Sequence, residues 1–360
     1  MRNSELYIRR CLQLAKLGEY YVAPNPMVGA VLVKHKVEYG ADKEVILGEG
    51  WHMQYGGAHA EPNCLLNAEE NHPEGIDYKH CTLYVNLEPC SHYGKTPPCA
   101  ELIIKKGIGR VVIGSLDPNP EVSGRGVRML ESAGIEVHVG VLEAECRALN
   151  KRFMCLQEKK RPYVILKWAQ TADGYLDKKR EAGKPLVIST PLMKQLVHQQ
   201  RAENMAIMVG TRTILMDNPR LLTTHWSGRH PIRITMDRHG ILPQESNIFS
   251  NDSETIVYRE NTDWEAMLAD LSRRNIHSVL VEGGARLLNS ILVSGIYDEV
   301  HVEVSNTHLG EDGEGVEAPA YSFKTRPQVI DEHLVYIEKK SIKFAYIRKK
   351  QYLCVINMFV

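Results

Sequence analysis

Three metal-binding side chains and one carboxylate lie close together in the first third of the chain. His59 is found in the run Gly-Gly-Ala-His-Ala-Glu-Pro, two residues before Glu61, and Cys90 and Cys99 belong to the run Glu-Pro-Cys-Ser-His-Tyr-Gly-Lys-Thr-Pro-Pro-Cys. An imidazole and two thiolates are typical zinc ligands, and three protein ligands leave a fourth position open for water. A structural zinc site would be closed by a fourth Cys or His. These residue types therefore predict a catalytic zinc site.

The same donor set predicts how such a site would work. Two thiolates and a neutral imidazole cancel the charge of the metal, so its water is a weaker acid than in an all-imidazole site and needs a base nearby. Glu61 can take the proton of this water and pass it to a ring nitrogen and a leaving amine. Zinc-dependent base deaminases carry His-x-Glu followed by Pro-Cys-x-x-Cys. Here eight residues separate the two cysteines, so the pattern is a variant of that motif.

The spacing also places demands on local structure. Residues two apart in the middle of a helix do not share a face, so His59 and Glu61 can converge only if a helix begins at about His59. A second helix that begins beside Cys99, after a Pro-Pro pair, would stabilise a thiolate at its N-terminus. His92 is not expected to be a ligand, because a fourth ligand would close the water position.

Composition and charge describe an ordinary globular chain that is long enough for two domains. Its 360 residues include 44 Lys plus Arg and 44 Asp plus Glu, so no overall charge favours nucleic acid or a membrane as partner. Because a signal-peptide core and a long apolar run are both missing, we expect a cytoplasmic protein with reduced thiols. Six of the eight cysteines are expected to be small buried residues. These are Cys11, Cys64, Cys81, Cys146, Cys155 and Cys354.

Helical and strand-like segments alternate along the first half. Helices are expected at 5–17, 59–70, 99–106 and 127–133, and strands at 27–33, 82–87, 110–115 and 135–141. Ser4 is the expected cap of the first helix, and the charged segment 34–47 is expected to be a long exposed hairpin. This alternation predicts a three-layer α/β domain. A charged connector ends at Pro162, so we expect domains at 1–150 and 162–360 with a connector at 151–161.

Four motifs of the first half resemble one enzyme family. They are Pro24-Asn-Pro-Met-Val-Gly29, His59-Ala-Glu61, the run from Glu88 to Cys99, and Asp117-Pro-Asn-Pro120. They look like the bifunctional pyrimidine deaminase–reductases of riboflavin biosynthesis, and the resemblance extends over nearly the whole chain. It implies a cytidine-deaminase-like three-layer α/β/α domain followed by a dihydrofolate-reductase-like α/β domain. It also implies zinc on His59, Cys90 and Cys99, with Glu61 as proton shuttle.

The resemblance further implies contacts to the substrate, 2,5-diamino-6-ribosylamino-4(3H)-pyrimidinone 5′-phosphate. The implied contacts are Asn25, His52, Lys95, Asp117 and Asn119. Asn side chains can pair with the donor and acceptor edges of the ring, and the Lys95 ammonium is a compact cation for the phosphate. The alternative is a purely structural role, because Asn in Pro-flanked turns often satisfies backbone groups only.

The second half is expected to form a further α/β domain. Strands are expected at 163–168, 206–210, 231–236, 255–258, 297–304 and 353–359, and helices at 190–201, 264–274 and 286–293. The run Ser278-Val-Leu-Val-Glu-Gly-Gly-Ala285 predicts a strand, a Gly pair and a helix start, where backbone N–H groups can approach a phosphate. Alone this is a weak nucleotide signal. It is not Gly-x-Gly-x-x-Gly, so a Rossmann domain is not indicated.

By resemblance this half is a reductase that uses NADPH and delivers hydride to C1 of the sugar in its open, imine form. The cofactor carries the hydride, and the protein supplies alignment and charge. The implied cofactor contacts are Ala169, Thr213, Asp217, Gly284, Ala285, Arg286 and Ser290, and the implied substrate contacts are Arg201, Leu221 and Glu282. Lys167, at a strand end, is either a further substrate contact or a solvated residue.

Three departures from the family pattern affect the reductase half. First, Pro185-Leu-Val-Ile-Ser189 stands where the family has Ser-x-Trp-Ile-Thr/Ser, so Val187 replaces an aromatic residue. Second, Asn218 replaces an Asp, and third, Thr224 replaces an Arg. Loss of that Arg removes one phosphate partner. Arg201 remains, and His225 and Arg229 are candidates to compensate. A deaminase with an impaired reductase half is therefore one alternative.

Two other functions share part of this pattern. A nucleic-acid base deaminase with an accessory domain would have His-x-Glu but also a basic face with aromatic stacking residues. The balanced charge of this chain and its content of only five Phe argue against this function. A zinc-stabilised binding module would have a closed metal site and no role for Glu61. We expect zinc and NADPH as cofactors, small pyrimidine ribotides as substrates, no nucleic-acid or membrane partner, and a homo-oligomer of undefined size.

Overall fold

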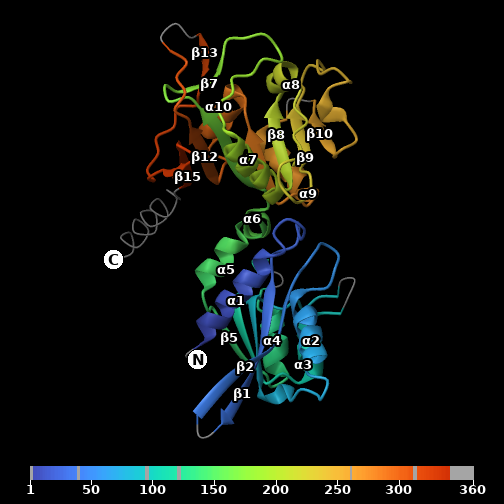
Figure 1. The fold of residues 1–360 in the computed structure, drawn as a ribbon. Helices are drawn as coiled ribbons and strands as arrows, with labels where there is room; N and C mark the ends of the chain where they lie inside the picture. Colours follow the sequence, from blue (N-terminus) through green and yellow to red (C-terminus); the bar gives the residue numbers. More distant parts are fainter. Residues whose placement is uncertain are drawn as a thin grey trace, which may run out of the picture.

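The chain folds into two α/β halves that lie end to end and are joined by short helices (Figure 1). The computed structural model describes residues 3–38, 41–93, 97–119, 123–259, 262–310 and 314–340. No helix within these ranges is long and apolar enough to cross a membrane. The strand expected at 353–359 lies outside the described residues.

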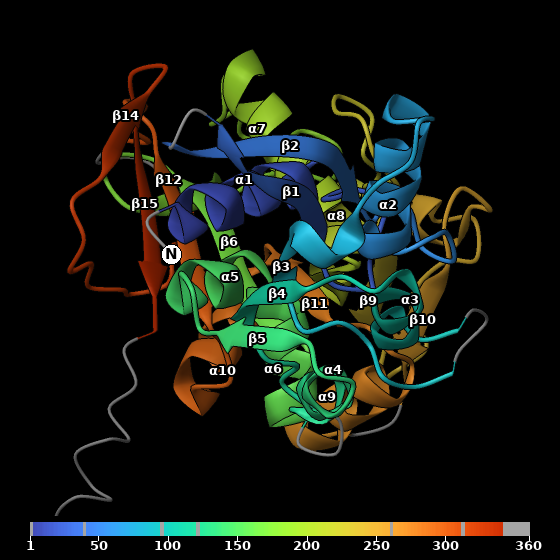
Figure 2. The ribbon, with the colours of Figure 1, turned by 90° about the horizontal axis from the view of Figure 1, so that it is seen from below.

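The first half is a three-layer structure around a five-stranded sheet of order β2-β1-β3-β4-β5. Its strands are β1 (Gly29–Glu38), β2 (Ala41–Trp51), β3 (Cys81–Leu87), β4 (Arg110–Ser115) and β5 (Glu136–Val139), and its helices are α1 (Ser4–Lys16), α2 (Ala60–Asn71), η1 (Tyr78–His80), α3 (Cys99–Lys106), α4 (Arg125–Ser132) and α5 (Glu143–Leu149). α1 and α5 cover one face, and α2, α3 and α4 cover the other (Figure 2). The central strand β3 is buried at every residue, which explains its continuous apolar sequence. The expected three-layer architecture is confirmed.

Two local expectations in this half need correction. Ser4 is not a cap but the buried first residue of α1, and Asn3, at the cap position, makes no side-chain capping bond. The hairpin expected at 34–47 is longer in the structure. β1 and β2 pair along their whole length, from Gly29 opposite Trp51 to Glu38 opposite Ala41. β2 also supports α2 closely: a Cβ on Gly50 would lie 2.2 Å from a backbone nitrogen of that helix. This close packing fixes where α2 begins.

The second half is built on an eight-stranded sheet of order β10-β9-β8-β11-β6-β12-β15-β14. The first six strands in this order are parallel, and the last two are antiparallel to their neighbours. The strands are β6 (Tyr163–Gln170), β8 (Ala206–Gly210), β9 (Ile232–Met236), β10 (Thr255–Tyr258), β11 (Ser278–Glu282), β12 (Glu299–Val304), β14 (Gln328–Ile330) and β15 (His333–Lys339), with β7 (Tyr175–Lys178) and β13 (Gly315–Glu317) as a separate pair. The helices are α6 (Lys151–Lys159), α7 (Pro191–Glu203), α8 (Thr211–Asp217), η2 (Asn247–Phe249), α9 (Trp264–Arg273) and α10 (Ala285–Ser294).

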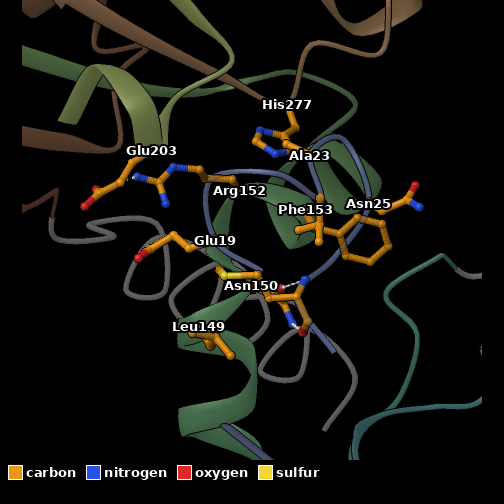
Figure 3. A pocket seen from close by; sticks show the side chains of 11 residues that line it. Glu19, Ala23, Asn25, Leu149, Asn150, Arg152, Phe153, Glu203 and His277 are labelled. Atoms are coloured by element: carbon orange, nitrogen blue, oxygen red, sulfur yellow. Dashed lines mark hydrogen bonds and ion pairs between the residues drawn. The ribbon is translucent and has the colours of Figure 1, made fainter. Parts of the chain in front are cut away.

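The two halves meet where α5 ends and α6 begins. Oδ1 of Asn150 accepts from the backbone N–H of Met27 (2.8 Å), and its Nδ2 donates to the carbonyl of the same residue (2.9 Å). Arg152 on α6 reaches into the second half and donates to the Asn204 side chain (3.1 Å). Figure 3 shows the cavity beside Asn150 and Arg152, of about 30 Å³, which has room for about one water molecule. This junction is a packed polar contact whose cavity is too small for a pyrimidine ribotide.

Asp298 ties the end of α6 to the start of β6 in the second half. Its carboxylate accepts from Arg161 at 2.6 and 2.8 Å, from Lys159 at 3.0 Å and from the backbone N–H of Val164 at 3.0 Å. Its side chain is only 7% exposed. Burial opposes ionisation, but the hydrogen bonds and charge of Arg161 hold the pKa of Asp298 below its usual range. The ionised carboxylate therefore stabilises the fold.

We expect Asp298→Asn to lower the free energy of unfolding of the second half by about 2–3 kcal/mol near neutral pH, because two cations lose their buried counter-charge. The depressed pKa means that this stabilisation is fully present above the unfolded-state pKa of about 4 and is lost as the pH falls through the lower folded-state value. The difference between variant and wild type should therefore shrink in acid. Denaturant unfolding measured at several pH values tests both statements.

Asp252→Asn is the matched control, because Asp252 forms an exposed ion pair with Arg220 (3.0 Å). Exposed pairs contribute little to stability. Its denaturation midpoint should stay close to wild type. A midpoint of Asp298→Asn equal to that of this control would contradict the role assigned to Asp298.

Candidate active sites

Three segments bring the predicted metal ligands together. His59 precedes α2 with extended backbone (φ −72°, ψ 174°), and Glu61 follows in the first turn of the helix. Cys90 lies just after the central strand β3, and Cys99 is the first residue of α3. Helices thus begin where the sequence spacing required them, next to His59 and at Cys99.

The ligand atoms of these residues have the separations of a metal site. They all lie within 4.8 Å of one another. Nδ1 of His59 is 3.6 Å from Sγ of Cys90 and 3.4 Å from Sγ of Cys99. A tetrahedral zinc ion with Zn–N of about 2.1 Å and Zn–S of about 2.3 Å would separate nitrogen and sulfur by about 3.6 Å. The donor set therefore fits zinc, with Nδ1 as the ligand atom of His59.

Glu61 and the two thiols form one strongly interacting cluster. Glu61 is only 3% exposed, and this burial, together with the charge of Cys90, raises the pKa of its carboxyl to about 7. The carboxyl also hydrogen-bonds the Cys99 thiol. The backbone N–H of Cys99 donates to Sγ of Cys90 (3.2 Å), and the hydrogen bonds of Cys99 and His59 lower the pKa of Cys90. A carboxyl in this position can both accept and donate a proton.

Asn25 and His52 lie beside the metal ligands. His52 is buried, with its Nδ1 2.8 Å from the carbonyl of Ala58 and its Nε2 3.1 Å from Nδ2 of Asn25. The carbonyl requires a proton on Nδ1, so Nε2 accepts from the Asn25 amide. The His52 ring lies 5.5 Å from the His59 ring, edge to face. This arrangement leaves Oδ1 of Asn25 as an acceptor close to the metal ligands.

Asp117 lies on the turn after β4, where its Oδ1 accepts from the backbone N–H of Asn119 (2.8 Å), and burial raises its pKa. Glu88, which the sequence did not single out, organises this turn. Its carboxylate accepts from the N–H groups of Asp117 (3.1 Å) and of Gly124 (3.0 Å), just before α4. The only sequence signal for Glu88 was its place directly before the Pro-Cys pair. Lys95 lies outside the described residues.

In the second half, three parallel strands end at the predicted cofactor site. β11 pairs with β8 and β6 in parallel, so their carboxyl ends share one edge of the sheet, where open α/β sheets bind ligands. Gly283 and Gly284 follow β11 with φ of +81° and +79°, which glycine adopts without strain. A Cβ on Gly284 would lie 3.3 Å from Oγ1 of Thr213 on α8. Thr213, Gly284 and Ala285, the first residue of α10, are thus brought together.

The predicted reductase substrate residues form a second group. Arg201 on α7 donates from Nε (2.9 Å) and Nη2 (2.7 Å) to the two carboxylate oxygens of Glu282. Its Nη1 donates to the carbonyl of Leu222 (3.1 Å), next to Leu221, which has φ of +57°. Burial opposes ionisation of Glu282, but the charge of Arg201 holds its pKa below the usual range. Lys167 on β6 is the register partner of Glu282 and adjoins this group.

The other predicted cofactor residues are more dispersed. Asp217, at the end of α8, accepts from Arg180 (2.5 Å). Arg286 and Ser290 are exposed on α10, and Ala169 is near the end of β6. Among the described residues, these four do not form a contact group of their own.

The departures from the family pattern lie near this site. Val187 is 68% exposed. Thr224 is exposed, and its backbone N–H donates to Nδ1 of His198 (3.0 Å), whose ring is 4.7 Å from that of His225. Arg229 donates to a backbone carbonyl of the first half (2.8 Å). Of the two candidates to compensate for the missing Arg, only His225 therefore lies against α7.

Comparisons with known proteins agree with this geometry. Residues 1–115 match the family described as cytidine and deoxycytidylate deaminase zinc-binding region, and residues 162–338 match the RibD C-terminal domain. The chain is 37% identical over 331 residues to riboflavin biosynthesis protein RibD of Actinobacillus pleuropneumoniae, with 84% of each protein covered. It is 36% identical over 363 residues to RibD of Aquifex aeolicus, with 93% of this chain and 98% of that protein covered.

Solved structures give the same result. A Thermotoga maritima deaminase/reductase superposes with a TM-score of 0.79 at 36% identity, and Acinetobacter baumannii RibD (form 1) with 0.81 at 30% identity; each comparison covers 94% of this chain and 99% of the other. The expected fold class, cytidine-deaminase-like and then dihydrofolate-reductase-like, is confirmed. The chain belongs to the RibD family of bifunctional riboflavin biosynthesis enzymes, with a zinc-dependent deaminase half and an NADPH-dependent reductase half.

Proposed function

We propose that the chain deaminates 2,5-diamino-6-ribosylamino-4(3H)-pyrimidinone 5′-phosphate and then reduces the ribosyl group of the product to ribityl. The Thermotoga maritima relative is named a diaminohydroxyphosphoribosylaminopyrimidine deaminase and 5-amino-6-(5-phosphoribosylamino)uracil reductase. The observation that carries the proposal is the convergence of His59, Cys90 and Cys99, whose ligand atoms lie within 4.8 Å of one another, beside the buried carboxyl of Glu61.

In the deaminase half, zinc when bound supplies a Lewis acid that makes water a nucleophile near neutral pH. Glu61 would take one proton from the attacking water and pass it to the ring nitrogen as the C–O bond forms. It would then carry the second proton of that oxygen to the amine, which leaves as ammonia when the C–N bond breaks and the ring carbonyl forms. The Cys99 thiolate at the start of α3 is stabilised by the helix N-terminus. Because Glu61 is not one of the metal ligands, its role is proton transfer alone.

The substrate of this half would lie between the Asn25–His52 pair on one side of the metal ligands and Asp117, whose carboxyl feels the charge of Cys90, on the other. Oδ1 of Asn25, which accepts no hydrogen bond from the described residues, suits an amino or ring N–H of the pyrimidine. The backbone N–H of Asp117 donates to Glu88, which holds the turn that carries its partly buried carboxyl. We assign Asn119 to the same contact surface, and Lys95 to the phosphate by its type alone.

In the reductase half, the nicotinamide dinucleotide would lie along the carboxyl edge of β6, β8 and β11. Backbone N–H groups at Gly284 and Ala285 would hold its phosphates, with Thr213 beside them. Asp217, Arg286, Ser290 and Ala169 would line the remainder. Arg201, Leu221 and Glu282 would face the ribosylamino group of the substrate, which brings C1 within reach of the cofactor's hydride.

Gly284→Asp tests the phosphate contact. A carboxylate at this helix start would repel a phosphate, and its Cβ would crowd Thr213. We expect KM for NADPH to rise by about tenfold or more, with ammonia release unchanged, as measured by initial rates of each half-reaction.

Gly295→Asp is the matched control, because Gly295 also has a positive φ (+69°) but lies at the opposite end of α10. Its αL backbone (ψ 16°) strains an Asp less than the backbone of Gly284 does (ψ 102°), and it lacks the proposed contact, so the control isolates the added charge and not the strain. Equal KM values for NADPH in the two variants would refute the assignment of Gly284.

A coupled assay tests the whole proposal. The purified chain is supplied with the diaminopyrimidine ribotide and NADPH, and ammonia release and NADPH oxidation are followed with and without a zinc chelator. Without chelator we expect both ammonia release and NADPH oxidation. With chelator we expect neither signal from the ribotide, and added deaminated substrate should restore NADPH oxidation alone. Ammonia released from RNA in place of the ribotide would favour a nucleic-acid deaminase, and ammonia without NADPH oxidation would indicate an impaired reductase half.

We also propose the domain limits 1–150 and 162–360, a cytoplasmic location and a homo-oligomer. α5 contributes Cys146 to the core of the first half and α6 contributes Cys155 to that of the second, which supports a boundary between these helices. The seven described cysteines are all free thiols, in keeping with a reducing compartment. Val329 (71% exposed) on the edge strand β14 and its register partner Leu334 (36%) on β15 give an exposed apolar pair beside this edge, which suits a second copy. Light scattering on the purified chain measures the oligomeric state.

A further inference from the structure

The segment 218–231 of the reductase half joins α8 to β9 and contains no helix or strand. Segments of more than about 12 residues without secondary structure are uncommon in compact domains and are usually functional. This one carries Leu221 and Leu222, and the carbonyl of Leu222 accepts from Arg201 (3.1 Å). Leu221 has a φ of +57°, a conformation that a leucine keeps only where its surroundings hold it. The contacts that hold this segment therefore also hold a predicted substrate residue.

Two contacts of this segment cross to the deaminase half. Nη1 of Arg229 donates to the carbonyl of Ala23 (2.8 Å). The ring of Trp226 packs edge to face on that of Tyr20, with centroids 6.5 Å apart and an angle of 72° between the rings. Gly228 lies so close that a Cβ on it would be 3.1 Å from Cβ of Tyr20. Nε1 of Trp226 is buried with no hydrogen-bond partner among the described residues, so packing fixes this side chain.

The hydrogen bond to Ala23 is the main anchor of Arg229. Arg229 is partly buried, and this burial lowers the pKa of its guanidinium. Within the described parts of the chain, no carboxylate pairs with it, and the Ala23 carbonyl is the acceptor of its side-chain hydrogen bond. Hydrogen bonds from a charged donor are roughly twice as strong as neutral ones. The first half therefore supplies the polar contact that this cation has.

Tyr20 and Ala23 belong to a closely packed part of the first half. Val22 and Ala23 are buried, and the N–H of Val22 donates to the carbonyl of Gly18 (3.1 Å). A Cβ on Gly18 would lie 2.5 Å from the carbonyl oxygen of His52, so the chain passes directly over the end of β2. Ala23 also lines the small cavity between the halves (Figure 3). The core of the first half thus fixes this surface, and the reductase segment rests on it.

A hydrogen bond within the segment links its two ends. The backbone N–H of Thr223 donates to Nδ1 of His230 (3.2 Å), the residue next to Arg229. Thr223 directly follows Leu222, whose carbonyl accepts from Arg201. A displacement of Arg229 would therefore move Thr223 and Leu222 with it. These contacts form a continuous physical connection from the Ala23 carbonyl to the predicted reductase substrate residues.

We propose that the deaminase half positions the segment 218–231, so that the affinity of the reductase for its substrate depends on Tyr20 and on the Ala23–Arg229 hydrogen bond. This inference rests on the proposed function, in which Arg201 and Leu221 face the substrate. It adds that side chains and backbone of one half set the affinity of the other. Tyr20 acts through Trp226 and contacts none of the predicted substrate or cofactor residues, so it is a positioning residue.

Tyr20→Ala in the full chain tests this proposal. We expect KM for the deaminated substrate to rise about tenfold, because loss of the ring frees Trp226, while kcat and the KM for NADPH change by less than about twofold. Tyr20→Phe keeps the ring and should keep the wild-type KM. Arg229→Met should raise the same KM by a similar factor. The double variant Tyr20→Ala, Arg229→Met should show less than the product of the two factors, because both substitutions remove one support.

Leu17→Ala is the matched control, because Leu17 is 59% exposed directly after α1. It should behave as wild type, and unchanged ammonia release in every variant shows that the first half is folded. Hydrogen exchange of the backbone amides of 221–230 gives a second measurement that needs no turnover. Exchange should be faster in Tyr20→Ala than in Tyr20→Phe or Leu17→Ala.

A wild-type KM for the deaminated substrate in Tyr20→Ala would overturn the inference, as would an equal rise of the KM for NADPH, which would indicate general damage. If the wild type fails to oxidise NADPH with the deaminated substrate, the proposed function fails. Hydrogen exchange then still decides whether the first half holds the segment, since equal exchange in Tyr20→Ala and wild type would exclude this support.

Discussion

Glu61→Gln should lower the deaminase kcat by about 10³- to 10⁴-fold and leave the zinc content unchanged. The carboxyl is buried beside Cys99 and His59, so it is placed to transfer a proton, but it is not one of the three ligand atoms. Glutamine keeps the size of the side chain and its hydrogen-bonding capacity but cannot accept a proton at neutral pH. Ammonia release measures the rate, and metal analysis of the purified variant measures the zinc.

The control for this substitution is Glu70→Gln, an exposed position on the same helix. It should match wild type in both zinc content and ammonia release. Reduction of already deaminated substrate should be normal in Glu61→Gln, because the reductase residues belong to the other half. Substantial ammonia release from zinc-loaded Glu61→Gln would exclude the proton-shuttle role.

The deaminase site was accessible from the sequence because its chemistry restricts both residue type and spacing. Few side chains can bind zinc, and His59 can approach Glu61 only at a helix start, which is where α2 begins. The role of Glu88 was not predictable in this way. Its contacts to the turn after β4 form between segments that are distant in the chain and that only the folded sheet brings together.

In the reductase half, more depended on the tertiary structure. The strand β15 (His333–Lys339) mixes polar and apolar residues, and it forms because it pairs with β12 along six residues. Lys167 could not be assigned from the sequence because strand-end lysines are commonly solvated. The structure shows a partly buried lysine whose ammonium has no hydrogen-bond or ion-pair partner in the described ranges.

The two sites use the same structural principle with different chemistry. In each half, a side chain at the carboxyl end of a central strand is completed by residues at the start of a following helix. Cys90 lies just after β3 with Cys99 at the start of α3, and Glu282 is the last residue of β11 with Ala285 at the start of α10. Helix N-termini stabilise negative charge. We propose that the first site uses this for a metal-bound thiolate and the second for a phosphate.

Cys90→Ser should abolish zinc binding, and deamination with it, by about 10³-fold or more. Serine offers no thiolate, so only His59 and Cys99 would remain to bind the metal. The substitution also removes the hydrogen bond from the Cys99 backbone N–H to Sγ of Cys90 (3.2 Å). Metal binding is coupled to local folding. Chelation should therefore lower the unfolding temperature of the first half in wild type but not in Cys90→Ser.

Cys64→Ser separates loss of a ligand from loss of a buried sulfur. Cys64 is fully buried on α2, where its thiol donates to the Gly48 carbonyl (3.3 Å), and a serine hydroxyl can make the same bond. This variant should keep its zinc, its ammonia release and its response to chelator, whereas Cys90→Ser should lose all three and retain NADPH oxidation with deaminated substrate. A fully metallated Cys90→Ser protein would remove Cys90 from the ligand set. Equal losses of zinc and of ammonia release in both variants would show that zinc binding responds to general damage to the core. The contrast between these two cysteines of one domain therefore decides whether a specific thiolate holds the metal.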